Sequence, residues 1–193
     1  MAGFSNVIGF DDAPFLREHR GNVLLVGAVC ARTRLDGVVT TRIRRDGANA
    51  TRRVIEIVQS SGYRRHLHAV LLQGIAVGGF NVIDINAVHA ELDLPVLVVV
   101  RRRPDMDSIR RALFAGGPRK LGVPGATRKW QLIERAGPPE PLTGLFVQRA
   151  GLSPSEAQEL ITRTRLQGAL PEPIRLAHLI AGGVTTGRSR GRA

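Results

Sequence analysis

Cysteine, lysine and aromatic residues are scarce in this sequence. The 193 residues contain one cysteine, Cys30, so an internal disulfide is impossible, and no Cys/His spacing predicts a zinc site. Aromatic residues make up 4% of the chain, too few for the base-stacking platform of a single-strand binder. All basic residues apart from Lys120 and Lys129 are arginines. A nucleic-acid partner would therefore be recognised through its backbone and groove shape.

Long hydrophobic runs and the common nucleotide and nucleophile motifs are also missing. No apolar run approaches the roughly 20 residues of a membrane-spanning helix, and no charged leader followed by an apolar segment opens the chain. We therefore expect no membrane association and a cytoplasmic location. There is no Gly-x-x-x-x-Gly-Lys-Ser/Thr loop and no Gly-x-Ser-x-Gly elbow. Nucleotide-cofactor enzymes and serine hydrolases are thus disfavoured.

Positive charge is abundant. The 28 basic and 16 acidic residues give a net charge of +12. Such an excess attracts polyanions, and guanidinium groups match phosphate bidentately. We predict DNA as the partner, with contacts from Arg44, Arg45, Arg101, Arg102, Arg103 and Arg175. A GC-rich genome or thermal adaptation would also enrich arginine without any function.

The hydrophobic pattern predicts one α/β domain. Apolar runs at residues 7–10, 22–31 and 38–43 predict three antiparallel strands, with a hairpin turn at Asp36-Gly37. The later elements are a helix from Ala48, strands at 70–72, 96–100 and 145–148, helices at 82–92, 106–114, 153–166 and from Pro171, and an irregular segment at 115–141 with a short strand at 130–133. This order is typical of a ribonuclease H-like fold, a mixed sheet flanked by helices. We assign residues 1–181 to this domain and 182–193 to a basic, flexible tail.

Two adjacent carboxylates, Asp11 and Asp12, end the first apolar run. Ligands of open α/β sheets bind at the carboxyl ends of strands, and Mg²⁺ favours carboxylate oxygens. Asp46 and Asp84 also lie at a strand end or a strand–helix junction, so these acids are candidates to converge on a cation. Structural alternatives exist for each of these features. Asp-Asp-Ala-Pro is also a turn signal, Asp84 could cap a helix, and a single histidine such as His178 is more often structural.

Four sequence blocks carry a recognisable pattern, namely Asn-Val-Ile-Gly-Phe-Asp-Asp-Ala-Pro-Phe at 6–15, Arg-Asp-Gly-x-x-Ala-Thr at 45–51, Gly-Gly-Phe-Asn-Val-Ile-Asp at 78–84 and Leu-Pro-Glu-Pro-Ile-Arg-Leu-Ala-His at 170–178. They resemble the endonuclease dU family, which was long catalogued as a domain of unknown function, is mainly archaeal, and is related to endonuclease V. They occur in the family's order and span nearly the whole chain.

The resemblance extends to endonuclease V and implies roles for individual residues. The Gly-x-Asp of its first strand is similar to Gly9-Phe10-Asp11, and its Arg-Glu is similar to Arg45-Asp46. His178 stands where that family has an active-site polar residue. Its Val-Asp-Gly block falls on Leu72-Gln73-Gly74, where the acid is missing.

The function implied by the resemblance is metal-dependent cleavage of phosphodiester bonds in deaminated, deoxyuridine-containing DNA, as part of DNA repair. Asp11, Asp46 and His178 would be catalytic, and Asp11, Asp46 and Asp84 would bind Mg²⁺ or Mn²⁺. Asp84 would then replace the charge lost at Gln73. A nucleic-acid-binding protein of the same fold without catalysis is one alternative. A small-ligand α/β protein whose charge reflects genome composition is another. The sequence leaves the oligomeric state open.

Overall fold

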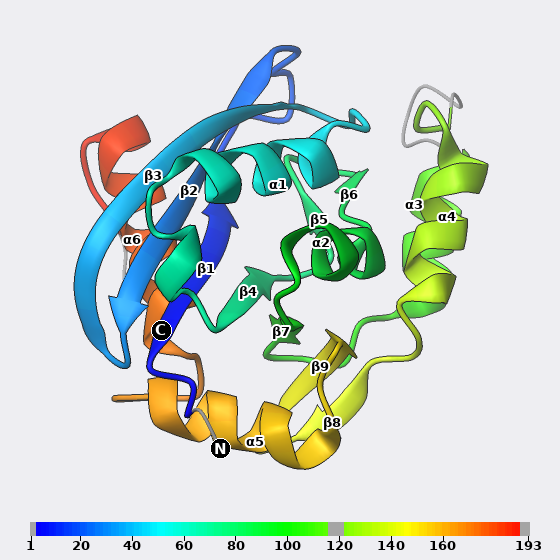
Figure 1. The fold of residues 1–193 in the computed structure, drawn as a ribbon. Coiled ribbons are helices and arrows are strands. Elements are labelled where there is room, and N and C mark those ends of the chain that lie inside the picture. Colours follow the sequence, from blue (N-terminus) through cyan, green and yellow to red (C-terminus); the bar gives the residue numbers. More distant parts are fainter. Residues whose placement is uncertain (1–2, 116–121, 190–193) are drawn as a thin grey trace.

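A seven-stranded mixed sheet, in the order β3-β2-β1-β4-β7-β9-β8, forms the centre of the fold (Figure 1). The computed structural model describes residues 3–115 and 122–189. The strands of this sheet are β1 Asn6–Asp12, β2 Asn22–Ala31, β3 Arg34–Arg44, β4 Ala69–Gln73, β7 Val96–Val100, β8 Glu140–Leu142 and β9 Leu145–Ala150. As predicted, the first three strands are antiparallel. Strands β1, β4 and β7 run parallel at the centre.

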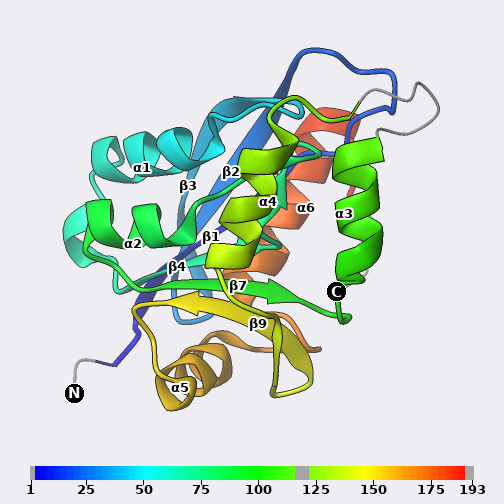
Figure 2. The same cartoon turned by 90° about the vertical axis from the view of Figure 1, so that its right-hand side faces the viewer.

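Helices cover both faces of the sheet, which explains why the central strands are apolar on both sides. Helices α1 (Ala50–Ser60) and α2 (Ile85–Leu92) pack on one face, and α5 (Pro154–Thr164) and α6 (Glu172–Thr186) pack on the other. Helices α3 (Met106–Ala115) and α4 (Ala126–Arg135) lie side by side (Figure 2) and pack against a small hairpin. That hairpin consists of β5 (Ala76–Val77) and β6 (Asn81–Val82). A short 3-10 helix, Arg64–His66, follows α1.

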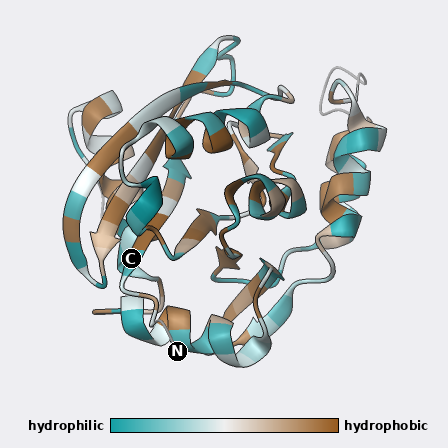
Figure 3. Ribbon diagram, in the orientation of Figure 1, coloured by the Kyte–Doolittle hydropathy of each residue, from teal (hydrophilic) through white to brown (hydrophobic). Residues whose placement is uncertain are grey.

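Figure 3 shows the resulting distribution of hydrophobic residues, which concentrate on the central strands and the inward sides of the helices. The strand residues divide between the two layers by strict alternation. Ile8 and Phe10 pack toward α1 and α2, whereas Val7 packs toward α5 and the start of α6. Among the described residues, no helix is long and apolar enough to cross a membrane.

The segment predicted as irregular, residues 115–141, differs from the expectation. Residues 126–135 form helix α4, so the short strand predicted at 130–133 is wrong. Four residues with three large apolar side chains cannot distinguish a strand from a helix by pattern alone. Packing decided the outcome, because Ile133 and Trp130, three positions apart on a helix, contact the same cluster beside the β5–β6 hairpin. Residues 116–121 of this segment lie outside the described part of the chain.

The predicted turn at Asp36-Gly37 is also wrong, because both residues lie within β3. The chain reverses instead at Arg32-Thr33, where Arg32 has a φ of 57°. Gly37 has a packing role, since a Cβ there would collide with the hydroxyl of Tyr63. A glycine in an Asp-Gly pair therefore marked a close side-chain approach and not a hairpin turn.

The last two helices begin where the sequence predicts. Ser153 and Glu156 form the predicted capping box, with Pro154 in the first turn of α5. Helix α6 starts after Pro171, as predicted, but continues to Thr186. Residues 182–186, which the sequence assigns to the tail, are thus helical despite their two glycines. Residues 190–193 lie outside the described part.

Candidate active site

The carboxyl end of β1 carries Asp11 and Asp12 at the edge where the parallel strands β1, β4 and β7 all end. Neighbouring strand residues point to opposite faces, so Asp11 shares a face with Val7 and Gly9, and Asp12 shares a face with Phe10. Asp11 is only 6% exposed. The pair therefore places one carboxylate on each side of the sheet at its ligand-binding edge.

Gly9 brings helix α6 close to β1. A Cβ at Gly9 would collide with the backbone of Pro173 and lie 2.6 Å from the amide nitrogen of Ile174. From this contact, Asp11 is two residues further along the strand, about 6.7 Å. His178 is four residues beyond Ile174 on the same helix face, about 6 Å further. Asp11 and His178 are therefore at similar distances from the Gly9 contact, and His178 Nδ1 lies 2.7 Å from Asp11 Oδ2.

Both carboxylates are destabilised as anions. Burial raises the pKa of Asp11 to about 6, and the charge of Asp12 adds to this effect, while the hydrogen bond and charge of His178 oppose it. Burial also raises the pKa of Asp12, against a hydrogen bond from the backbone of Gly78. The site thus has excess negative charge in a desolvated place. A cation bound there would favour the ionised form of both groups.

Gln73 occupies the next strand at the same level. The β1–β4 register pairs Gly9 with Leu71 and Phe10 with Leu72, so one further step places Asp11 beside Gln73 on the same face. The Oε1 atom of Gln73 is buried and accepts no hydrogen bond from the described residues. Buried amide oxygens normally have a donor. This oxygen is therefore available to a ligand at the carboxylate pair.

Asp46 serves as an anchor for the glycine loop at residues 78–80. Its φ is 51°, and its amide donates to the carbonyl of Gly78 at 2.9 Å. Its Oδ1 accepts from the amide of Phe80 at 2.9 Å, and a Cβ at Gly79 would collide with that oxygen. Because the loop in turn presents the backbone of Gly78 to Asp12, Asp46 is connected to the carboxylate pair through the loop.

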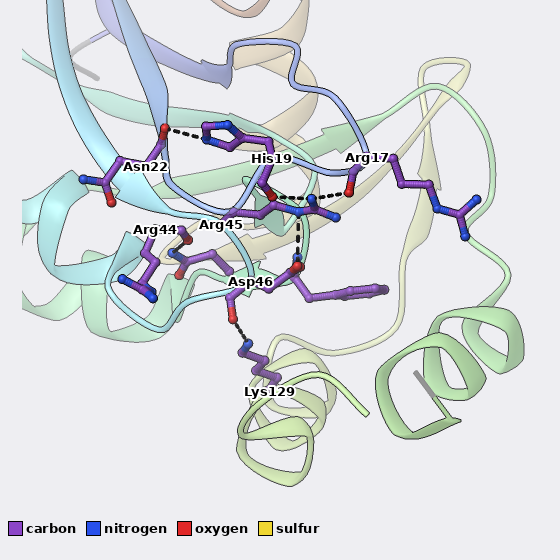
Figure 4. A network of polar contacts seen from close by, with 9 residues as sticks. Arg17, His19, Asn22, Arg44, Arg45, Asp46 and Lys129 are labelled. Atoms are coloured by element: carbon purple, nitrogen blue, oxygen red, sulfur yellow. Dashed lines mark hydrogen bonds and ion pairs between the residues drawn. The ribbon is translucent and has the colours of Figure 1, made fainter. Parts of the chain in front are cut away.

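Lys129 on α4 holds Asp46 from the other side (Figure 4). Its Nζ donates to the backbone oxygen of Asp46 at 2.6 Å, and the residue is 3% exposed. Burial lowers the pKa of this ammonium group, and the charge of Asp46 works in the opposite direction. The sequence does not point to Lys129, because this residue lies in the segment predicted as irregular, where no helix connects it to Asp46.

Asp84 caps helix α2. Its Oδ1 accepts from the amide of Ala87 at 3.1 Å, and its Oδ2 lies 3.4 Å from Nη1 of Arg135. No group of three or more His, Cys, Asp or Glu side chains among the described residues is arranged to hold a metal ion. The predicted convergence of Asp11, Asp46 and Asp84 is therefore absent. Asp84 is instead the N-cap of α2, the structural alternative given above, since its side chain accepts a hydrogen bond from an otherwise unpaired amide of the first helical turn.

The six arginines predicted to contact DNA fall into two groups. Arg45 donates to the carbonyls of Arg17 and His19, and Arg175 forms two hydrogen bonds to Glu172, at 2.7 and 2.8 Å. Both guanidinium groups thus have partners within the protein, and their contact with DNA stays a prediction. The other four are exposed residues, namely Arg44, Arg101, Arg102 and Arg103.

Comparison with known proteins identifies the family. Residues 4–185 match the family model described as endonuclease dU. The chain belongs to the endonuclease dU family. A UPF0215 protein of Deinococcus radiodurans is 54% identical over 188 residues, which cover 97% of this chain and 93% of the relative. The predicted family is confirmed.

Solved structures of other proteins show which fold the endonuclease dU chain shares. A protein from Archaeoglobus fulgidus superposes with a TM-score of 0.84 and 34% identity, covering 94% of this chain and 99% of its own. Endonuclease V of Ciona intestinalis, solved with inosine-containing DNA, has a TM-score of 0.56 and 11% identity, covering 90% and 82%. The predicted ribonuclease H-like fold is confirmed. The family is described as an endonuclease, and the solved structures show its fold.

Within this endonuclease dU fold, the structure joins only some of the residues predicted from the sequence. Asp11 and His178 are in direct contact, and Asp46 is connected through the glycine loop. The sequence predicts Asp12 as one of the acids that could converge on a cation, but the resemblance to endonuclease V gives it no catalytic or metal-binding role. In the sequence Gly9 is one residue of a motif, and its close contact with α6 is seen only in the structure.

Proposed function

We propose that the protein is a metal-dependent endonuclease that cleaves phosphodiester bonds in deaminated DNA, with deoxyuridine-containing DNA as its substrate. The adjacent carboxylates of buried Asp11 and half-buried Asp12, with Asp11 joined to His178 at the carboxyl edge of the central strands, are the observation that carries this proposal. The endonuclease dU family supports the substrate, and the complex of Ciona endonuclease V with inosine-containing DNA supports DNA as the partner.

The residues at this edge fit Mg²⁺ or Mn²⁺. Proteins often hold Mg²⁺ with one or two carboxylates, and waters and substrate phosphates complete the coordination. Asp11 and Asp12 supply two carboxylates with raised pKa, and Gln73 supplies a buried oxygen without a donor. We therefore assign the ion to Asp11 and Gln73, which share a face of the sheet, with Asp12 adding its charge from the other side, in place of the predicted Asp11, Asp46 and Asp84. A bound ion would activate water and stabilise the leaving oxygen.

His178 is suited to handle a proton beside the cleaved bond. When Asp11 is ionised, it accepts a hydrogen bond from Nδ1–H of His178, so the neutral imidazole presents Nε2 as an acceptor. The side chain of His178 is 43% exposed, so a water molecule can reach it. In this proposal, His178 orients the attacking water and accepts its proton. Asp46 acts indirectly, by holding the glycine loop against Asp12.

A second candidate is a nucleic-acid-binding protein of the same fold without catalysis. The neutral Gln73, at a position where endonuclease V has an acid, favours it. So does the absence of a three-ligand metal cluster among the described residues. This candidate retains the arginine surface and the ribonuclease H-like fold but requires no cation. The two candidates therefore differ in metal binding and in strand cleavage.

A nicking assay distinguishes them. Duplexes containing uracil, inosine or no damaged base would be incubated with the protein in Mg²⁺, Mn²⁺ or EDTA. We expect cleavage of the uracil duplex with either ion, none in EDTA, and none with Asp11→Asn. The matched control is Asp84→Asn, which changes an acid outside the carboxylate pair and should retain cleavage. Metal-independent binding without nicking would establish the second candidate.

Direct metal binding provides a readout that does not depend on activity. Isothermal titration with Mn²⁺ should show one site in the wild type that is lost in Asp11→Asn. Gln73→Asp replaces a neutral oxygen with a carboxylate and should increase the affinity by about tenfold, on the order of 1.4 kcal/mol. Equal affinity in the wild type and Gln73→Asp would remove Gln73 from the site.

A further inference from the structure

The positive charge on the helices is concentrated on α3 and α4, which lie side by side on one flank of the molecule (Figure 2). These two helices contain five arginine or lysine residues and two aspartate or glutamate residues, whereas α1, α2, α5 and α6 together contain four and five. An arginine excess that came from genome composition or thermal adaptation alone would spread over all the helices. The concentration on one pair of helices therefore indicates a local contact with a polyanion.

The arginines of the α3–α4 pair lie on its outward faces. In α3, the apolar residues face the cluster beside the β5–β6 hairpin, and Arg111 lies on the opposite side of the helix. In α4, Arg128 and Arg135 are seven positions apart, so they share a face and are separated by two turns, about 10.5 Å. All three residues are exposed. Phosphates recur roughly every 3.4 Å along one DNA strand, so the row on α4 spans about three of them.

The guanidinium groups of this pair retain donors for phosphate. Arg128 forms no hydrogen bond or ion pair with any residue in the described part of the chain. Arg111 donates to the hydroxyl of Ser108 at 2.8 Å, which uses one of its five N–H donors. Arg110 lies over the ring of Trp130, 5.8 Å from the ring centroid, and this contact joins α3 to α4. The ring of Trp130 is therefore occupied and is not a platform for stacking a base.

Helix α4 is attached to the candidate active site near both of its ends. Near its start, Lys129 donates to the backbone oxygen of Asp46 at 2.6 Å, and Asp46 anchors the glycine loop against Asp12. At its end, the carbonyl of Arg135 accepts a hydrogen bond from the side-chain amide of Asn86 at 3.3 Å. A surface on this helix therefore has a fixed position relative to the carboxylates.

Exposed arginines connect the α3–α4 pair to the edge that carries the carboxylates. The β4–β7 register pairs Gln73 with Val99, and the exposed residues 101–103 begin two positions beyond Val99 and lead to α3. Paired strands are about 4.8 Å apart and successive Cα atoms about 3.8 Å, so the Cα atoms of Gln73 and Arg101 are at most about 12 Å apart. A nucleic-acid backbone at the carboxylates can therefore continue over the end of β7 to the α3–α4 pair.

We propose that the outward face of the α3–α4 pair binds the phosphate backbone of duplex DNA beside the candidate active site, through Arg110, Arg111 and Arg128. The proposal rests on the proposed function in taking DNA as the partner, and it names the surface and the form of DNA that this surface binds. Contacts to phosphates position a duplex without reading its sequence. Guanidinium groups match phosphates, and the occupied ring of Trp130 disfavours a single strand with exposed bases.

Fluorescence anisotropy in EDTA tests this surface without requiring cleavage. The probes are a labelled duplex without a damaged base and one of its single strands. The variant combines Arg110→Gln, Arg111→Gln and Arg128→Gln. We expect it to weaken duplex binding by at least about tenfold at about 0.1 M salt and to lower the slope of log K against log salt by up to about 3, because each lost phosphate contact contributes about 0.9.

The matched control removes the same charge from other helices. It combines Arg52→Gln, Arg53→Gln and Arg163→Gln, on α1 and α5, and should change the slope by less than about 1. A second variant, with only Arg111→Gln and Arg128→Gln, leaves the aromatic contact between α3 and α4 intact. It should lower the slope by up to about 2, so that loss of the contact between the helices cannot account for the effect.

Three results would overturn the proposed surface. Unchanged duplex binding in the triple variant of α3 and α4 would exclude these arginines from the interface. Equal losses in that variant and in the matched control would mean that only the net charge of the protein matters. Tighter binding of the single strand than of the duplex, lost in Phe114→Ala, would assign the surface to unpaired bases stacked on Phe114, an aromatic residue of α3 that is 44% exposed.

The nicking assay separates this surface from the proposed function. In Mg²⁺, the triple variant should raise KM for the uracil duplex and leave kcat unchanged, because contacts away from the cleaved bond bind substrate and transition state equally. Duplex binding that depends on the α3–α4 pair, in a protein that fails to nick, would support the surface and overturn the nuclease. Nicking with an unchanged KM in the triple variant would support the nuclease and overturn the surface.

Discussion

Among single residues, Asp11 shows the strongest conflict between stability and function. Its pKa in the folded state, about 6, lies above the ordinary value of 3.8, mainly because the carboxyl group is buried. The folded protein therefore holds this proton more tightly than the unfolded chain does. The resulting stabilisation is complete below a pH of about 4 and is lost as the pH rises through about 6. At neutral pH the ionised Asp11 destabilises the metal-free fold.

This conflict gives the first prediction. Asp11→Asn should abolish nicking and yet stabilise the metal-free protein at pH 8, by on the order of 2 kcal/mol, because the buried charge is removed. The gain should disappear at pH 4, where the wild-type carboxyl is already protonated. Urea denaturation in EDTA at pH 4, 6 and 8 measures both effects. Equal destabilisation at all three pH values would show that the carboxyl group is only a structural hydrogen-bond partner of His178.

Asp84 gives a second prediction at the residue scale. Asp84→Ala removes the N-cap of α2 and should lower the free energy of unfolding by about 1 kcal/mol, whereas Asp84→Asn should change it by only a few tenths because asparagine caps equally well. Both variants should keep wild-type nicking. The loss of the ion pair to Arg135 adds little, since its two atoms are 3.4 Å apart and the Arg135 side chain is 60% exposed. Loss of metal-dependent nicking in Asp84→Asn would restore Asp84 to the metal site.

At the scale of secondary-structure elements, the approach of α6 to β1 determines whether the site forms. The contact between Gly9 and Pro173–Ile174 sets the distance between β1 and α6. Asp11 and His178 meet because they lie at similar distances from this contact along the strand and the helix. A similar relationship holds on the other face, where Lys129 and Asp46 connect α4 and the end of β3 to the glycine loop. The positions of the residues in the candidate site therefore depend on these two packing contacts.

The third prediction concerns Gly9→Ala. The added methyl group pushes α6 away from β1, so the variant should lose about 1–3 kcal/mol of unfolding free energy and most of its nicking activity. The ring resonances of His178, followed by NMR, should lose their dependence on Asp11. The matched control is Gly183→Ala on the same helix, where no atom lies within 4 Å of the added Cβ. That variant should be more stable by about 0.5–1 kcal/mol. Wild-type stability of Gly9→Ala would mean that the spacing is adjustable.

For the whole molecule, the net charge of +12 predicts how DNA binding depends on salt. Each neutralised phosphate contributes about 0.9 to the slope of log K against log salt, so several contacts should give a slope of several units. Binding should depend little on sequence. A flat salt dependence would assign the arginine excess to genome composition and not to a partner.

The fourth prediction tests whether the arginines at 101–103 contact DNA. Replacing Arg101, Arg102 and Arg103 by alanine should reduce the slope by up to about 3, about 0.9 for each lost contact, with little change in stability because all three are exposed. The control is the double variant of Arg52 and Arg53, which both pair with Glu56 and should contribute less. Filter binding between 50 and 200 mM salt, an interval that resolves such slopes, provides the measurement. An unchanged slope in the triple variant would exclude this cluster from the interface.

Features with a local cause were determined by the sequence itself. The capping box of Ser153 and Glu156 needs only residues three positions apart, and the buried strands β1 and β7 follow from uninterrupted apolar runs. The sequence blocks also identified the family, and with it the fold, because each block retains its residues and their order. These features depend on short-range geometry or on whole-chain resemblance, and both are visible without coordinates.

Only the tertiary structure decided which polar groups meet. Asp11 and His178 are 167 residues apart in the sequence, and their contact depends on how closely α6 packs on β1. Asp46, Asp84 and Arg45 all looked available in the sequence, yet each is engaged by a backbone or side-chain partner. A carboxylate or guanidinium binds whichever donor or acceptor the packing brings within about 3 Å. Such partners are set by the arrangement of elements in space, which the order of residues alone does not contain.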